Sequence, residues 1–341
     1  MLSRTADHLF WMARYIERAE NTARMLDVTH QMSLLPQSDA QAESHWAALL
    51  GITELRSLFE QHYSVLSAAN VLEFMVWDLG NPSSIYNCLR VARENAHAVR
   101  GRLTTEVWEM HNATWLELQQ LARSHRAQQD ADADISPFFD WVKFRSHLSR
   151  GVTIGTMLKD EAFYFIRLGT FFERADNTAR ILDAQYHALA QQGQHTQKAA
   201  LPNGVERRVN PDRSLDSNPH RDFYHWNALL RSVSAFEIYR RVYRDVIIPE
   251  RIVELLILRA DMPRSLLACL QEVVSNLASV QNHHSAETQR RAGLLQSELQ
   301  FGRVNDILET GLHAYLTRFL ERIHDLGIRI SQDFLLPQQD V

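Results

Sequence analysis

The chain has 341 residues, of which 12 are glycine and 9 are proline, about half the usual share of these two residues. Because turns depend on glycine and proline, this composition predicts long helices and disfavours glycine-rich dinucleotide folds. A net charge of −5 argues against binding of nucleic acid. No apolar run is long enough to cross a membrane, and charged residues interrupt the N-terminal segment where a signal peptide needs an apolar run. We expect a cytoplasmic protein that binds neither nucleic acid nor a membrane.

The first predicted helix covers residues 9–27. Its apolar residues alternate in steps of three and four, which indicates one face packed on the core. Polar residues recur at helical spacing on a neighbouring face. The candidate ligand- or partner-binding residues of this stripe are Glu17, Arg18, Asn21 and Arg24.

A second polar segment, residues 90–108, is also predicted to be helical. A solvated helix face and a binding face both explain its charged residues, and the two interpretations stay open. Its candidate site residues are Arg93, Glu94, Asn95, Arg100 and Glu106.

The first helix returns later in the chain: residues 17–27 and 173–183 share nine of eleven identities at a shift of 156. Further matches, at shifts of 180 and 181, pair residues 45–50 with 225–230 and Cys88 with Cys269. The larger shift locates an insertion in the polar stretch 191–219, which is expected to be a mobile loop.

These matches predict an all-α, internally duplicated multi-helix bundle with repeats at 1–155 and 156–341. The spacing fits either two separate domains or one interleaved bundle; we expect one compact body, because a repeated helix with strong self-similarity usually packs against its twin. Polar breaks are expected near 35–43 and 124–136. The two cysteines are expected to act as small buried hydrophobic residues.

The second copy of the polar stripe supplies further candidates. If the two copies form reciprocal Glu–Arg pairs, the motif fixes helix packing. If the copies instead converge on one cleft, their charges hold a polar, zwitterionic or anionic ligand such as a peptide or a nucleotide. The second-copy candidates are Glu173, Arg174, Asn177 and Arg180.

Three stretches carry a resemblance to a known family: residues 2–27, the REN and EVW triplets at 93–95 and 106–108, and residues 156–183. Over nearly the whole chain they resemble the alpha-E family, all-helical bacterial proteins named for a Glu-Arg motif. By this resemblance the motif falls on the two stripes, and Asp160 and Glu161 match the family's acidic pair before the second motif.

The resemblance also implies partners. Members of the family are typically encoded beside a circularly permuted ATP-grasp protein and a transglutaminase-like protease. Such a neighbourhood suggests that a peptide is made or modified through amide-bond formation. ATP and Mg are then expected on the partner ligase, with no cofactor in this chain.

Metal and nucleophile chemistry finds little support. Glu94 and His97, like Glu321 and His324, have the Glu-x-x-His spacing of di-iron bundles, but neither pair recurs in the other repeat. No metal site is therefore expected. The short motifs of P-loop, zinc-hydrolase, esterase and thiol-redox proteins are missing.

Three hypotheses follow from the sequence. The first is an accessory protein that binds the peptide of an ATP-grasp amide ligase or completes the site of that ligase. The second is an enzyme that acts on a peptide by itself, with Glu17 or Glu173 as acid–base. The third is a structural protein in which the Glu-Arg motif only fixes packing.

Overall fold

The computed structural model describes residues 1–34, 39–127, 134–199 and 219–336. Within these ranges the backbone forms fifteen α-helices and no strand, so the predicted all-α class is confirmed. The helices are α1 (Ser3–Ser33), α2 (Asp39–Ile52), α3 (Arg56–His62), α4 (Ala68–Val76), α5 (Ile85–Ala98), α6 (Thr105–Ala127), α7 (Ser136–Thr156), α8 (Glu161–Ala199), α9 (Pro219–Ser232), α10 (Phe236–Tyr243), α11 (Pro249–Val253), α12 (Leu266–Ser279), α13 (Ala286–Phe301), α14 (Val304–Thr310) and α15 (Leu312–Ile330).

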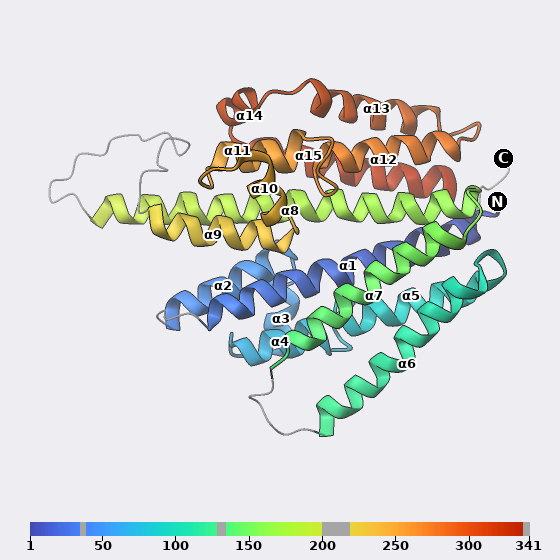
Figure 1. Cartoon of the computed structure of the whole chain (residues 1–341), viewed down its shortest axis with the longest axis horizontal. Helices are drawn as coiled ribbons and strands as arrows, with labels where there is room; N and C mark the ends of the chain where they lie inside the picture. The colour runs from blue at the N-terminus through green and yellow to red at the C-terminus, as the bar shows by residue number, and fades with distance from the viewer. Residues whose placement is uncertain (35–38, 128–133, 200–218, 337–341) are drawn as a thin grey trace.

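Helices α1 and α8 run side by side in the same direction through the centre of the molecule (Figure 1). They approach closely at Gly169 in α8, where an added Cβ would stand 2.2 Å from the backbone oxygen of Phe10. Only glycine fits such a contact, because any side chain would overlap the facing backbone. The contact fixes the register of the two helices and so decides which polar residues meet further along.

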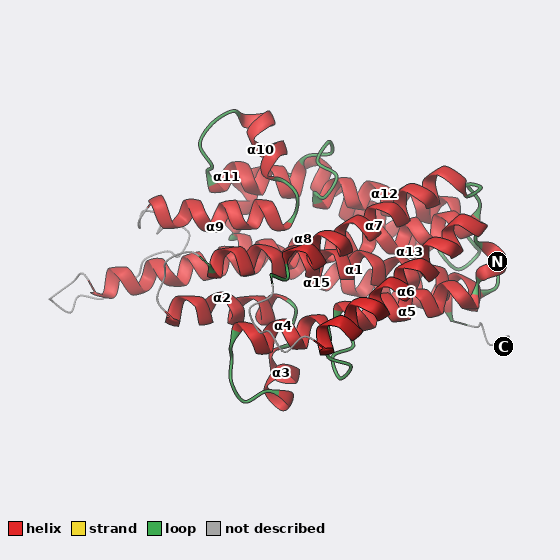
Figure 2. Cartoon of the chain, turned by 60° about the horizontal axis from the view of Figure 1, so that its bottom comes forward, coloured by secondary structure: helices red, strands yellow, loops and turns green. Residues whose placement is uncertain are grey.

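The remaining helices surround this central pair. Helices α5 and α7 pack on α1, whereas α12 and α15 pack on α8. Figure 2 shows α8 passing between α9 and α2, both of which contact it. The two central helices therefore share one buried apolar core that extends into both halves of the chain.

Matched positions of the sequence repeat have matched local geometry. Glu54 and Ser234 end equivalent helices with φ of 57° and 55°. Ser84 and Ser265 cap α5 and α12, each accepting a hydrogen bond from a backbone N–H in the first turn. The ring of His45 contacts the ring of His225, with centroids 5.6 Å apart.

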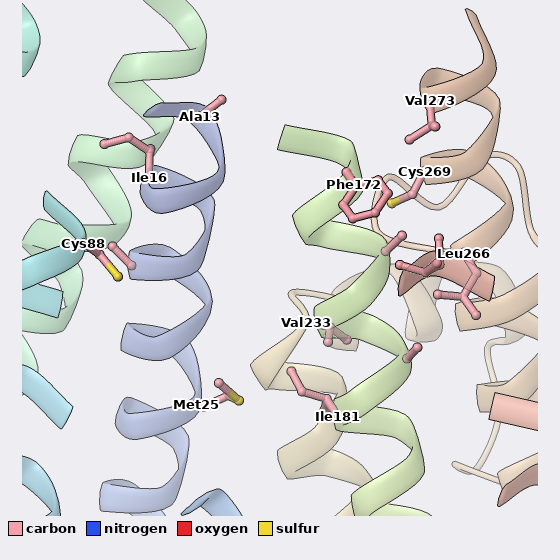
Figure 3. Packing of buried hydrophobic residues seen from close by; sticks show 14 of the residues in the cluster. Ala13, Ile16, Met25, Cys88, Phe172, Ile181, Val233, Leu266, Cys269 and Val273 are labelled. Carbon is pink, nitrogen blue, oxygen red and sulfur yellow. The ribbon is translucent and has the colours of Figure 1, made fainter. Parts of the chain in front are cut away.

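The two cysteines also stand at matched positions, and both are fully buried. Cys88 comes from α5 and Cys269 from α12, the helices that cover α1 and α8 (Figure 3). Burial raises the pKa of each thiol to about 12, so both behave as small apolar side chains.

The stretch expected as an insertion loop, 191–219, is helical at both ends, because α8 continues to Ala199 and α9 begins at Pro219. Glutamine, alanine and lysine, which fill much of 191–199, are good helix formers and outweigh the single glycine. Residues 200–218 lie outside the described residues, as do 35–38 and 128–133 in the expected breaks.

Candidate functional site

The two Glu-Arg dipeptides on α1 and α8 are paired crosswise. The guanidinium of Arg174 donates to both carboxylate oxygens of Glu17, at 2.8 and 3.0 Å. In the same way Arg18 donates to both oxygens of Glu173, at 2.6 and 3.2 Å. These are the reciprocal pairs expected if the motif fixes packing, and the forked geometry makes them strong, directional contacts.

Around Glu17 the space is filled by further side chains of this chain. Arg264, which precedes the α12 cap, donates to Glu17 Oε1 at 3.0 Å, Asn21 Oδ1 at 2.9 Å and Glu20 Oε1 at 2.6 Å. Arg150 from α7 bridges the same two carboxylates at 2.9 and 2.6 Å. We call this group the Glu17 cluster; it comprises the buried Glu17, Glu20, Asn21, Arg174 and Arg264 and the partly exposed Arg24 and Arg150.

The carboxylates of this cluster are held ionised. Burial would raise the pKa of Glu17, but Arg174 and Arg264 outweigh burial and bring it below its ordinary value. The pKa of Glu20 lies well below its ordinary value because Arg264, a hydrogen bond from His147, and Arg150 again exceed the cost of burial. The two carboxylates therefore stay ionised near neutral pH and hold the surrounding arginines in place, and they are not suited to accept or donate protons there.

Around Glu173 the arrangement is open. Arg14 and Arg18 hold the carboxylate, with Arg14 Nε at 2.7 Å from Oε2. Burial is again outweighed by Arg18 and Arg14, so the pKa of Glu173 falls to about 2. Where the Glu17 cluster has Arg264, this side has the short side chain of Ser83.

A cavity of about 460 Å³ occupies the open side, which is large enough for a small peptide or a single amino acid. We call it the Glu173 cavity. Its walls combine aromatic rings with three guanidinium groups and three carboxylates. The residues that line it and bear on its chemistry are Trp11, Arg14, Arg18, Asn21, Glu54, Ser83, Phe172, Glu173, Asp176, Asn177 and Arg180.

Two amide side chains in this wall keep free hydrogen-bonding capacity. Asn21 is 1% exposed, and its Nδ2 has no hydrogen-bond partner among the described residues. Asn177, at the matched position of α8, makes no side-chain hydrogen bond to any residue that the structure describes. Because a buried donor without a partner is costly, Asn21 marks a place where a ligand acceptor would be stabilised.

A family model matches residues 1–335 of the chain, and it describes a predicted alpha-helical domain with a conserved ER motif. The chain belongs to the Alpha-E family. Searches of the curated proteins and of the solved structures each gave no match. In this Alpha-E chain, the cross-paired dipeptides Glu17-Arg18 and Glu173-Arg174 are Glu-Arg sequences of the kind that the family description names.

Of the candidate residues in this Alpha-E protein, the eight on the two stripes meet at the centre. Five of them line the Glu173 cavity, and the other three lie in the Glu17 cluster. The five are Arg18, Asn21, Glu173, Asn177 and Arg180; the three are Glu17, Arg24 and Arg174.

The candidates from residues 90–108 lie elsewhere, at the corner of α5 and α6, and none of them lines the Glu173 cavity. Arg93 stacks over the ring of Trp108 and donates to Asn112. Asn95 Oδ1 accepts a hydrogen bond from His8 Nδ1 at 2.6 Å. Glu94 pairs with Arg90, whereas Arg100 and Glu106 are exposed.

The acidic pair Asp160 and Glu161 stands at the start of α8. Asp160 Oδ1 accepts from the backbone N–H groups of Ala162 and Phe163, and so caps the helix. Glu161 forms an ion pair with the N-terminal amine at 2.7 Å. Both lie about 20 Å along the helix from Glu173, so the pair orders the helix end and does not enter the cavity.

Three residues of the central site were not predicted from the sequence: Arg14, Arg150 and Arg264. Arg264 reaches Glu17 across 247 positions of sequence, and no local spacing predicts such a contact. One signal was available, because the matched segments Pro82-Ser83-Ser84 and Pro263-Arg264-Ser265 differ only at their middle residue.

A smaller cavity of about 230 Å³ lies on the other side of Glu17, against α6 and α7. His111 in its wall is buried, its Nε2 has no hydrogen-bond partner in the described part of the chain, and burial with Arg145 nearby lowers its pKa to about 4. Among the described residues, no group of three His, Cys, Asp or Glu side chains is arranged to hold a metal ion. Searched over the same residues, no helix is both long and apolar enough to cross a membrane.

Proposed function

We propose that this chain binds a polar peptide in the Glu173 cavity and serves as the accessory protein of a cytoplasmic ATP-grasp amide ligase. The observation that carries the proposal is the cavity itself, where Asn21 Nδ2 and the side-chain amide of Asn177 have no hydrogen-bond partner among the described residues and lie beside paired charges. Alternating carboxylate and guanidinium groups complement the amide and terminal groups of a peptide. The ligase, and with it ATP and Mg, is implied by the resemblance to alpha-E proteins, as is a transglutaminase-like protease partner.

Depressed pKa values favour a binding role over independent catalysis. A general acid or base is most effective when its pKa lies near the working pH. The pKa of Glu173 is about 2, and that of Glu17 lies below its ordinary value, so both stay ionised and engaged with arginine. Their chemistry suits orientation of a ligand more than proton transfer.

A packing role is the second candidate, and the crosswise pairs of Glu17 with Arg174 and Glu173 with Arg18 favour it. Buried ion pairs of this kind specify which helices meet and in which register. The two roles are compatible, because the same pairs that align α1 and α8 also form one wall of the cavity.

The decisive experiment incubates the ATP-grasp partner with ATP, Mg and amino acids, with and without this chain, and identifies products by mass spectrometry. We expect the chain to associate with the ligase and to change the amount or the length of its product. Arg180→Ala, which removes a charge from the cavity wall, should reduce this effect about tenfold. Arg290→Ala removes a similar intrahelical pair from the exposed face of α13 and serves as the matched control.

Two results would contradict the proposal. The first is a ligase that neither binds the chain nor alters its product when the chain is added. The second is turnover of a peptide by this chain alone that Glu17→Gln abolishes without unfolding the protein, because that would identify an independent enzyme.

A further inference from the structure

The Glu17 cluster contains its own example of a bound guanidinium. Arg264 is the side chain that occupies the space between Glu17, Glu20 and Asn21, and it donates to all three at 3.0 Å or less. It comes from the loop just before α12, and its guanidinium nitrogens make the contacts with these acceptors. The three acceptors thus form a receptor for a planar, forked cation.

The Glu173 cavity repeats these acceptors, with Glu173 held by Arg14 and Arg18, but the position matched to Arg264 supplies no guanidinium. Glu173, Asp176 and Asn177 stand on α8 at the spacing of Glu17, Glu20 and Asn21 on α1, and all three line the cavity. Asp176 pairs with Arg180 as Glu20 pairs with Arg24, through an oxygen–Nε contact of 2.9 Å in both cases. Ser83, which stands where the matched segment has Arg264, is too short to reach across.

The charge balance favours a cation here. In the Glu17 cluster, two carboxylates hold four guanidinium groups, one of which is Arg264. The Glu173 cavity has three carboxylates, including Glu54, against three guanidinium groups. A further guanidinium therefore enters a formally neutral site, which is less repulsive than the surroundings that Arg264 already tolerates.

The wall of the cavity opposite Glu173 has aromatic and amide groups that can contact the remainder of a ligand. Trp11 and Phe172 offer aromatic faces, and the Arg14 guanidinium already lies over both rings. The buried Asn21 Nδ2 is an unused donor, and it suits a carbonyl oxygen. A ligand with a guanidinium at one end and an amide carbonyl along its length matches both requirements.

We infer that the Glu173 cavity binds an arginine side chain of the ligand, with the guanidinium on Glu173, Asp176 and Asn177, in the place that Arg264 fills on the other side. This inference rests on the proposed function, since it names the chemistry of the peptide that the cavity holds. Free arginine and an arginine within a peptide share the guanidinium, but only the peptide supplies the internal carbonyl for Asn21.

The test measures binding of small probes to the full chain by isothermal titration calorimetry. The probes are N-acetyl-arginine methylamide, free arginine, and the citrulline and lysine counterparts of the first. Citrulline has the same shape as arginine without the charge, and lysine has the charge without the fork. We expect the arginine amide to bind at least about tenfold more tightly than either counterpart, and more tightly than free arginine.

Two variants and a control locate the site. Ser83→Arg should place a guanidinium in the cavity and weaken the arginine amide at least about tenfold. Asp176→Asn, at a partly exposed position, should weaken it by a similar factor and keeps the inference testable if Ser83→Arg fails to fold. Ser275→Arg adds the same side chain to an exposed position of α12 and should leave binding unchanged.

Equal binding of the arginine and citrulline amides would overturn the inference, and so would undiminished binding by folded Ser83→Arg. If the arginine amide fails to bind while the chain still alters the ligase product through Arg180, the inference fails and the proposed function stands. If the arginine amide binds and the ligase is unaffected, the cavity assignment stands and the accessory role fails.

Discussion

The surroundings of Glu17 and of Glu173 are built on the same Glu-Arg pairs, but they differ in how much space is left beside the pairs. We call them the Glu17 end and the Glu173 end. Around Glu17, side chains from α7 and from the loop before α12 complete the ion pairs, and Arg264 occupies the space between Glu17, Glu20 and Asn21. Around Glu173, a serine replaces the inserted arginine, and a cavity remains. The comparison teaches that a repeated charge motif is enclosed by ion pairs where a distant loop supplies an arginine, and borders a cavity where the matched residue is a serine.

The largest difference between the two ends should appear on removing their carboxylates. Glu17→Gln removes the negative charge between Arg174 and Arg264, both of which are less than a tenth exposed. Because the two buried guanidinium groups then repel each other, we expect the free energy of unfolding to fall by about 3–5 kcal/mol. Glu173→Gln should cost about 1–3 kcal/mol, because Arg14 and Arg18 border an open cavity and reach water. Urea unfolding of both variants measures the difference.

Surface Glu287→Gln, which removes an exposed partner of Arg290, is the control and should lie within about 0.5 kcal/mol of the parent. Equal losses at Glu17 and Glu173 would show that the two ends are not distinct in energy.

The surroundings of Glu17 should become like those of Glu173 when the Arg264 side chain is removed. Arg264→Ser removes one hydrogen-bond donor each from Glu17 and Glu20, while Arg150 and Arg174 remain. We expect the free energy of unfolding to fall by about 2–3 kcal/mol. Millimolar guanidinium chloride should then raise the melting temperature of the variant more than the same concentration of sodium chloride, because the ion binds the vacated place.

Arg251→Ser, which breaks an exposed pair with Asp245, should show no such rescue. An identical response of the two variants to guanidinium would mean that Arg264 leaves no receptor behind.

Acid should weaken the Glu173 end through a defined pH window. The pKa of Glu173 falls from an ordinary 4.5 to about 2 in the folded chain, so its stabilising contribution is complete above pH 4.5 and is lost as the pH falls toward 2. Between about pH 5 and about pH 3, Glu173→Gln should lose roughly 2 kcal/mol less stability than the parent. Urea unfolding at several pH values measures this, and parallel curves would contradict it.

The sequence predicts the helices well, because a helix depends on short-range spacing, and the repeat identifies the residues that pair crosswise without deciding that they do. The three-and-four alternation of residues 9–27 predicts the buried face of α1, whose members Leu9 and Leu26 are fully buried. The matched stripes on α1 and α8 are compatible with reciprocal pairs and with convergence on one cleft, and the structure shows that Glu17 pairs with Arg174 and Glu173 with Arg18.

What the sequence could not predict depends on contacts between distant segments. Gly169 stands where the first copy has Ala13, and its role becomes visible only when the backbone of Phe10 lies against it. Arg150 and Arg264 are ordinary residues of their own segments, and only the fold carries them to Glu17. The acidic pair at 160 and 161 matches the family pattern, yet spacing alone cannot separate a helix cap from a binding group.

The tight contact at Gly169 also determines how far different parts of the cavity would move if the angle between α1 and α8 changed. Glu173 lies about 6 Å further along α8, and Arg180 about 16 Å, at 1.5 Å per residue. If α1 and α8 rotate by about 10° around the contact, the ion pairs at Glu173 shift by about 1 Å, while the far wall at Arg180 shifts by about 3 Å. A side chain at position 169 that forced the two helices apart would therefore displace the far wall of the cavity about three times as far as the charges at its base.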